Sequence, residues 1–142
     1  MYKIGNMTYS KRPLEGDEQK ELVKQLELLK RKNIILEYYA TNNENNTYKQ
    51  DRKYAMIAEQ KAKAMGKKKG VSDICIILKD KVIYIEMKRQ KEVLKSGAIS
   101  KAKDDTSKEQ ITFLENVNKS DVVFGFVGNG FNDAFKKLSA YL

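Results

Sequence analysis

The segment 70–88, GVSDICIILKDKVIYIEMK, decides the fold that we expect for this chain. Two apolar runs, 74–78 and 82–85, flank the charged tripeptide Lys79-Asp80-Lys81. Short β-branched runs separated by a polar turn predict a β-hairpin. The segment therefore supplies two adjacent strands of a sheet.

Each expected strand of this hairpin carries a carboxylate. Asp73 stands immediately before the first strand, and Glu86 lies in the second strand with Lys88 two places later. Side chains alternate between the faces of a strand, so Glu86 and Lys88 share one face. Adjacent strands lie about 5 Å apart, so Asp73 can approach this pair. The pattern fits a metal site beside a cation, and Glu-x-Lys alone also fits a solvated edge strand.

Composition limits the class of protein and of partner. A chain of 142 residues with 41% hydrophobic and 33% charged residues is expected to fold as one soluble domain, residues 1–142. The net charge of +9 favours a polyanionic partner such as nucleic acid or an anionic membrane surface. No apolar run has the roughly 20 residues that span a bilayer, and no signal peptide is evident. We therefore expect a cytoplasmic protein that does not enter membranes.

Two residue types exclude whole classes of chemistry. The chain contains no histidine, which excludes Ser-His and Cys-His triads and HExxH zinc sites. Its single cysteine, Cys75, lies within an apolar run and is expected to be a core residue. Neither an intrachain disulfide nor a Cys-rich zinc site can form from one cysteine.

The chain before the hairpin begins with residues 1–16, which are expected to be irregular. A helix is then predicted with Asp17 as its N-cap, and apolar residues recur at helical spacing from Leu22 to Leu29. Glu18 lies one turn before Leu22, on the apolar side. It can be a site residue or a first-turn acid stabilised by the helix dipole, and the pattern leaves both interpretations open.

A basic segment precedes the hairpin. After an expected strand at 34–40 and a polar loop at 41–46, residues 49–69 predict a helix with one apolar and one basic side. A run of charge is commonly a solvated face, and here a phosphate-contacting surface is an equal alternative. The candidate nucleic-acid contacts are Arg52, Lys53, Lys61, Lys67, Lys68 and Lys69.

The chain after the hairpin completes an α/β pattern. Residues 89–105 predict a flexible loop, and Ser107-x-x-Gln110 fits a capping box that opens a helix. Gln110 can therefore serve the cap or the site. A strand at 121–127, a turn at 128–130 and a helix from Phe131 follow. The element order α-β-α-β-β-α-β-α predicts a mixed β-sheet flanked by helices.

These motifs together carry a family resemblance. A helix acid, Gly70-x-x-Asp73, the strand motif Glu86-x-Lys88 and the Ser107-x-x-Gln110 helix occur in the order seen in PD-(D/E)xK nucleases. The chain from residue 17 onward resembles the VRR-NUC family of that superfamily, including its small stand-alone phage and bacterial members. The resemblance implies a restriction-endonuclease-like core. Ser72 departs from the pattern, because the family has proline before the aspartate.

The resemblance also implies roles for individual residues. It implies that Asp73 and Glu86 bind a divalent metal, that Lys88 is the catalytic lysine and that Gln110 is an active-site residue. The backbone carbonyl of Met87 would complete the metal shell. A metal-linked acid on the first helix is matched to Glu18. Because that match rests on helical phase, Glu15 and Glu21 stay open as alternatives.

The expected function is Mg²⁺- or Mn²⁺-dependent hydrolysis of DNA phosphodiesters, since hard cations take oxygen ligands and can activate water without histidine. The substrate would be duplex, branched or flap DNA in phage or mobile-element replication, recombination or repair. A non-catalytic DNA-binding module and an RNA-directed nuclease are the alternatives. Two-strand cutting would call for a homodimer. Phe131 and Phe135 on the last helix are candidate dimer contacts, or else core residues.

Overall fold

Helices and strands alternate along the chain as an α/β protein requires. The computed structural model describes residues 1–41, 52–101 and 105–142. The elements within these ranges are β1 (Tyr2–Ile4), β2 (Met7–Tyr9), α1 (Glu15–Arg31), β3 (Glu37–Ala40), α2 (Arg52–Ala64), β4 (Ile74–Ile77), β5 (Val82–Lys88), α3 (Lys108–Val117), β6 (Val123–Asn129) and α4 (Phe131–Ser139). Residues 42–46 of the expected polar loop, residues 49–51 of the basic segment and residues 102–104 lie outside the described ranges.

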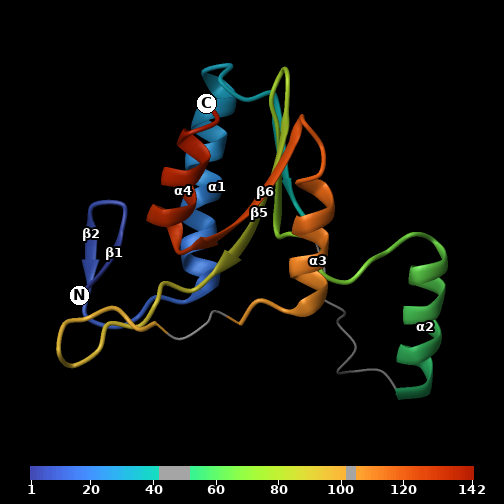
Figure 1. Cartoon of the computed structure of the whole chain (residues 1–142), viewed down its shortest axis with the longest axis horizontal. Helices are drawn as coiled ribbons and strands as arrows, with labels where there is room; N and C mark the ends of the chain where they lie inside the picture. Colours follow the sequence, from blue (N-terminus) through green and yellow to red (C-terminus); the bar gives the residue numbers. More distant parts are fainter. Residues whose placement is uncertain (42–51, 102–104) are drawn as a thin grey trace.

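A four-stranded mixed sheet forms the centre of the fold, in the order β3-β4-β5-β6. The predicted hairpin is confirmed: β4 and β5 pair antiparallel, with Ile74 opposite Ile85 and Ile77 opposite Val82. β3 adds antiparallel to β4, whereas β6 runs parallel to β5 after the crossover through α3. Figure 1 shows α1 and α4 together on one face of this sheet and α3 on the other.

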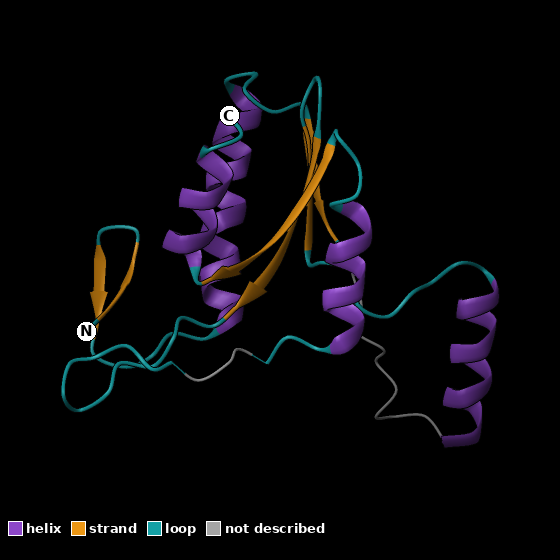
Figure 2. Cartoon of the chain, in the orientation of Figure 1, coloured by secondary structure: helices purple, strands orange, loops and turns teal. Residues whose placement is uncertain are grey.

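The two faces of β5 divide the core from the candidate site. Ile83, Ile85 and Met87 are fully buried and belong to the apolar cluster formed with α1 and α4. The alternate residues of β5, which include Glu86 and Lys88, face α3. Figure 2 shows the resulting three layers of helix, sheet and helix. This arrangement confirms the mixed sheet flanked by helices, and it matches a restriction-endonuclease-like core.

The N-terminal segment differs from its prediction. Residues 1–16 are not wholly irregular, because β1 and β2 form a small antiparallel hairpin that turns at Gly5, where φ is +59°. α1 begins at Glu15 after Leu14, so Asp17 lies inside the first turn and is not the N-cap. Three-residue strands carry too little periodicity to be recognised from sequence. The start of α1 was hard to locate from sequence, because Glu15 and Asp17 are both acidic residues that suit the first turn of a helix.

Three other boundaries also move. β3 begins at Glu37, later than the strand expected at 34–40. The described part of the basic segment is helical only over Arg52–Ala64 and continues as turn and loop to residue 70. β6 runs through the residues expected to turn, Gly128 and Asn129, because both pair with the end of β5. The chain instead turns at Gly130, where φ is +85°.

Helix α2 stands apart from the layered core. None of its residues is buried, and Figure 1 shows it beyond α3, away from the sheet. Among the described residues, no helix has the length and apolar character needed to cross a membrane.

Candidate metal-dependent active site

Asp73 and Glu86 meet where β4 and β5 begin to separate. The Asp73 Oδ2 atom accepts a hydrogen bond of 2.7 Å from the backbone N–H of Met87. This contact fixes the Asp73 carboxyl group beside the strand that carries Glu86. The Glu86 side chain is 1% exposed, although it is surrounded by other site residues rather than by the apolar core. The hairpin therefore brings together the two carboxylates that its sequence suggested.

Burial and proximity raise the pKa of both carboxyl groups. Burial, and then the charge of Asp73, raise the pKa of Glu86 to about 8, while the nearby Lys88 charge opposes this shift. Burial likewise raises the pKa of Asp73, against the hydrogen bond from Met87. Without a cation the pair therefore retains a proton near neutral pH, because two unneutralised charges this close repel each other.

Lys88 extends from the same strand face as Glu86. Its Nζ atom lies 3.6 Å from Glu86 Oε1 and donates to Gln110 Oε1 at 3.1 Å and to the Asp105 carbonyl at 3.3 Å. Only 14% of the Lys88 side chain is exposed. The ammonium group is therefore held beside the carboxylate pair by contacts from two separate segments.

Gln110 serves both the helix cap and the site. Its Nε2 donates to Glu86 Oε1 at 2.5 Å, while its Oε1 accepts from the Ser107 backbone N–H at 2.9 Å and from Lys88. Ser107 Oγ in turn accepts from the Gln110 N–H at 3.2 Å, which completes the capping box. The amide can do both because its oxygen has two lone pairs and its nitrogen has separate donors. The two interpretations of Gln110 are thus compatible.

The first helix contributes Glu15, not Glu18, to the surroundings of the carboxylate pair. Burial and the Asp73 charge raise the pKa of Glu15, and Lys88 and Arg89 lower it. Glu15 also acts electrostatically on Glu86. The alternative Glu15 thus interacts with the carboxylate pair, and the identity of the metal-linked helix acid stays a prediction. The predicted helical phase is itself confirmed, since Glu18 is buried together with Leu22 and Leu26 on one side of α1.

Glu18 has a different and fully buried position. Its Oε1 accepts from the Phe131 N–H at 3.0 Å and from Gln90 Nε2 at 2.7 Å. It therefore joins α1 to the N-terminus of α4, where a carboxylate is stabilised by the helix dipole. Gly130 is required there, since a Cβ atom would lie 2.6 Å from Glu18 Oε1. The third candidate, Glu21, contacts Gln25 and Lys24 on its own helix.

The predicted basic contacts fall into two groups. Lys67, Lys68 and Lys69 lie on the loop that leads to Gly70, and this loop rests against the start of α3. A Cβ atom at Gly70 would lie 2.5 Å from the Glu109 carbonyl oxygen, so only glycine allows this approach. The second group, Arg52, Lys53 and Lys61, is on α2 and is not brought to the carboxylate pair. An ion pair of 3.5 Å between Lys69 and Glu59 links the loop to α2.

Sequence reasoning missed two contributors near the site. Arg89 donates to the backbone carbonyls of Arg12 and Pro13, which ties the end of β5 to the segment before α1. The Asp105 carbonyl accepts from Lys88. The position of Arg89 directly after Glu86-x-Lys88 was a usable signal. A backbone carbonyl leaves no signature in a sequence.

The donor set fits a hard divalent cation. Within the described ranges, no three acidic, cysteine or histidine side chains form a ready-made ligand cluster. Asp73 and Glu86 nevertheless offer carboxylate oxygens, and Glu86 Oε2 is buried without a hydrogen-bond partner in the described structure. Mg²⁺ is commonly held by one or two carboxylates, with water and substrate phosphate completing its shell. An orphaned carboxylate oxygen and a retained proton are both expected where a cation normally binds.

The fold places the protein in the class of mixed α/β domains with a restriction-endonuclease-like core. No protein-family model and no curated protein sequence matches the chain. Among solved structures, one described as a "VRR_NUC domain protein" is similar over 93% of this chain and 90% of its own, with a TM-score of 0.52 and 16% identity. At that identity the similarity lies in the fold. The chain therefore shares the architecture of a VRR_NUC domain protein.

Proposed function

We propose that this chain is a divalent-metal-dependent nuclease that hydrolyses phosphodiester bonds in DNA. The observation that carries the proposal is the pairing of half-buried Asp73 with buried Glu86, held beside Lys88 by Gln110, in the fold of a VRR_NUC domain protein. A buried carboxylate pair is costly unless a cation offsets its charge. A metal-dependent nuclease uses such a cation to activate water and to offset charge on the scissile phosphate.

Asp73, Glu86 and the Met87 carbonyl would hold Mg²⁺ or Mn²⁺, and Glu15 is placed to act on the same site through its charge. The bound cation would lower the pKa of water and offset negative charge on the phosphoryl group. The chain supplies the preorganisation: the Met87 N–H fixes Asp73, and Gln110 fixes Glu86. The carboxylates are thereby oriented before substrate arrives.

Lys88 would stabilise the charge that develops on the phosphate oxygens. Its amino group is nearly buried and lies among oxygen atoms of Glu86, Asp105 and Gln110, which hold it in place. A positive charge with little solvent exposure stabilises a nearby negative charge more strongly than the same charge does in water. Gln110 therefore positions both a carboxylate and the cation.

DNA as substrate is supported by the net charge of +9 and by the lysines that lead into the site at residues 67–69. We further propose a structure-specific role in phage or mobile-element replication, recombination or repair, in the cytoplasm. Cutting both strands would need a symmetric dimer. The α4 phenylalanines do not offer its surface, because Phe131 is buried and Phe135 packs on it at 5.6 Å.

Cleavage of a substrate panel tests the proposal. Labelled duplex, flap, fork, four-way junction and RNA are incubated with the protein in Mg²⁺, in Mn²⁺ or in EDTA. We expect cleavage of at least one DNA substrate with either metal and none with EDTA. Binding without cleavage on every substrate would favour the non-catalytic module, and preferential cleavage of RNA would favour the RNA-directed nuclease.

A further inference from the structure

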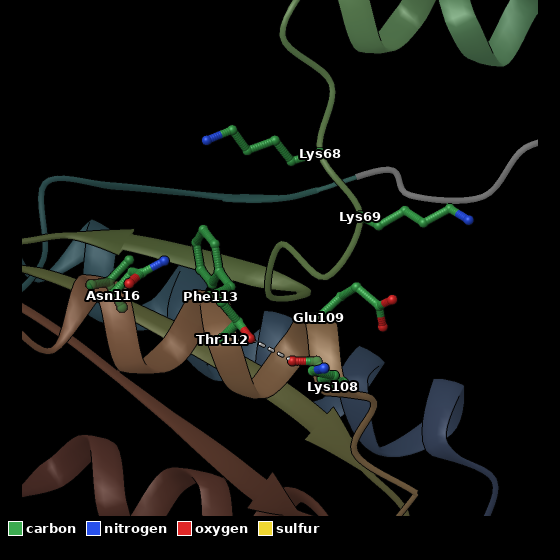
Figure 3. Close-up of a pocket in the computed structure, with 8 residues that line it drawn as sticks. Lys68, Lys69, Lys108, Glu109, Thr112, Phe113 and Asn116 are labelled. Atoms are coloured by element: carbon green, nitrogen blue, oxygen red, sulfur yellow. Dashed lines mark hydrogen bonds between the residues drawn. The ribbon is translucent and has the colours of Figure 1, made fainter.

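A groove lies beside the candidate site, between the loop at 67–70 and α3. It has a volume of about 680 Å³, and its lining includes Lys68, Lys69, Lys108, Phe113 and Asn116. Figure 3 shows the two loop lysines above the groove and the Phe113 ring rising from α3 into it. The groove is thus bounded by two segments that are far apart in sequence.

The groove combines positive charge with an aromatic ring. Three lysines line it against the single acid Glu109, and all four are exposed. The Phe113 ring is partly exposed and packs edge-to-face on Tyr84, with ring centroids 5.1 Å apart and planes at 88°. Tyr84 therefore fixes the orientation of the Phe113 ring. An aromatic ring fixed among cations is the combination that binds single-stranded nucleic acid, where bases stack and phosphates meet lysines.

The groove and the carboxylate site both adjoin the first turn of α3, which contributes Glu109 to the groove and Gln110 to the site. Gly70, at the end of the lysine loop, contacts the backbone of Glu109 and Gln110. The side chain of Gln110 contacts Glu86 and Lys88 on the sheet side of the helix. A strand lying in the groove would therefore lead toward the candidate site within about one helical turn, which is about 5 Å.

We propose that this groove binds an unpaired DNA segment next to the phosphodiester that is cut, with a base stacked on Phe113 and phosphates at Lys68 and Lys108. A paired base exposes only its edge in a duplex groove, whereas an unpaired base offers its face. The groove therefore selects substrates with a single-stranded portion. This inference rests on the proposed nuclease function and specifies its substrate.

Binding without cleavage tests the groove separately from the nuclease function. In EDTA, the affinity for single-stranded oligodeoxynucleotide and for blunt duplex is measured by fluorescence anisotropy with wild-type protein and with Phe113→Leu. Leucine keeps an apolar side chain against Tyr84 and removes the stacking face. We expect about tenfold weaker single-strand binding and a duplex affinity within twofold of wild type. Lys108→Ala should weaken single-strand binding and reduce its salt dependence.

Matched controls separate stacking from general damage. Phe124→Leu removes a partly exposed ring that packs on Tyr141, on the sheet face opposite α3. Lys79→Ala removes an exposed lysine from the β4–β5 turn. Both should leave single-strand affinity within twofold. Thermal melting of each variant identifies loss of folding.

A second readout keeps the test decisive if Phe113→Leu is unstable. An oligonucleotide containing 2-aminopurine should lose fluorescence when wild-type protein binds, because stacking on an aromatic ring quenches this base. Unquenched binding would overturn the proposal, as would equal losses for duplex and single strand in folded Phe113→Leu. Tighter binding of single-stranded RNA than of DNA would overturn the assignment to DNA. Absence of metal-dependent cleavage alone would instead contradict the nuclease proposal.

Discussion

The proton held by the Asp73–Glu86 pair is the residue-scale property with the clearest consequence. The pKa of Glu86 is raised to about 8 from the ordinary glutamate value of 4.5, chiefly by burial and by Asp73. The pKa values of Asp73 and Glu15 move in the same direction. In metal-free protein these shifts make the folded state bind more protons than the unfolded chain between about pH 4.5 and 8.

The metal-free protein should therefore lose stability as the pH rises through that window. The folded state keeps a proton that the unfolded chain has released, so the free energy of unfolding falls until about pH 8 and then levels. We expect the melting temperature in EDTA to fall by roughly 10–20 °C across the window. In Glu86→Gln the fall should be much smaller. A melting temperature that rises with pH, or an unchanged slope in Glu86→Gln, would contradict this explanation.

Glu15 and Glu18 differ in environment although both belong to the first turn of α1. Glu15 interacts with the charges of the candidate site, whereas Glu18 accepts two hydrogen bonds at the start of α4. Glu15→Gln should lower metal-dependent cleavage roughly ten- to a hundredfold, with little change in stability. Glu18→Gln should instead cost about 1–3 kcal/mol of unfolding free energy, because it weakens a buried acceptor.

Denaturant unfolding and single-turnover cleavage distinguish these two effects. Glu21→Gln is the control, since the polar contacts of Glu21 within the described residues are with Gln25 and Lys24 of its own helix. Full activity in Glu15→Gln together with inactive but stable Glu18→Gln would identify Glu18 as the helix acid.

At the scale of an element, the start of α3 couples helix capping to the site. Ser107 supplies only the cap, whereas Gln110 also contacts Glu86 and Lys88. Ser107→Ala should cost about 1 kcal/mol of stability, with cleavage reduced only a few-fold. Gln110→Ala should cost a similar amount and reduce cleavage far more, by roughly a hundredfold. Equal losses of activity in the two variants would mean that Gln110 acts only through the helix.

The elements also show how far sequence patterns reach. The hairpin around Asp73 and Glu86 was predictable, because two β-branched runs with a polar turn allow one local pairing. The role of Gln110 in the helix cap was predictable, because a capping box is a local sequence motif. Its contact with Glu86 was not, because the distance between the helix start and the sheet depends on the tertiary fold. The place of Glu15 was not predictable. It depends on where α1 begins, and Leu14 gives no side-chain cap signal.

At the scale of the whole molecule, the lysines near the site lie on two different segments, the loop at 67–69 and α2. Lys67, Lys68 and Lys69 lead to Gly70 and hence to α3, whereas the lysines of α2 stand away from the layered core. Phosphate contacts release counterions, so each of them steepens the dependence of affinity on salt. The loop and α2 should therefore contribute differently to that dependence.

Replacing Lys67, Lys68 and Lys69 by alanine should weaken DNA binding and reduce the slope of log affinity against log salt by about one for each phosphate that the variant no longer binds. Anisotropy titrations from low to physiological salt measure this slope. Lys79→Ala, in the turn at the other end of the hairpin, should leave the slope unchanged. A wild-type slope in the triple variant would remove the loop from the DNA interface.

Single-turnover cleavage in Mg²⁺ is the decisive measurement for the proposal that Asp73, Glu86 and Lys88 form a metal-dependent phosphodiesterase site. Wild-type protein is compared with Asp73→Asn and Lys88→Ala on the best substrate, with DNA affinity measured in parallel in EDTA. We predict that both substitutions reduce the cleavage rate by at least roughly a hundredfold while affinity stays near wild type. Wild-type cleavage rates in folded Asp73→Asn and Lys88→Ala would contradict the proposal.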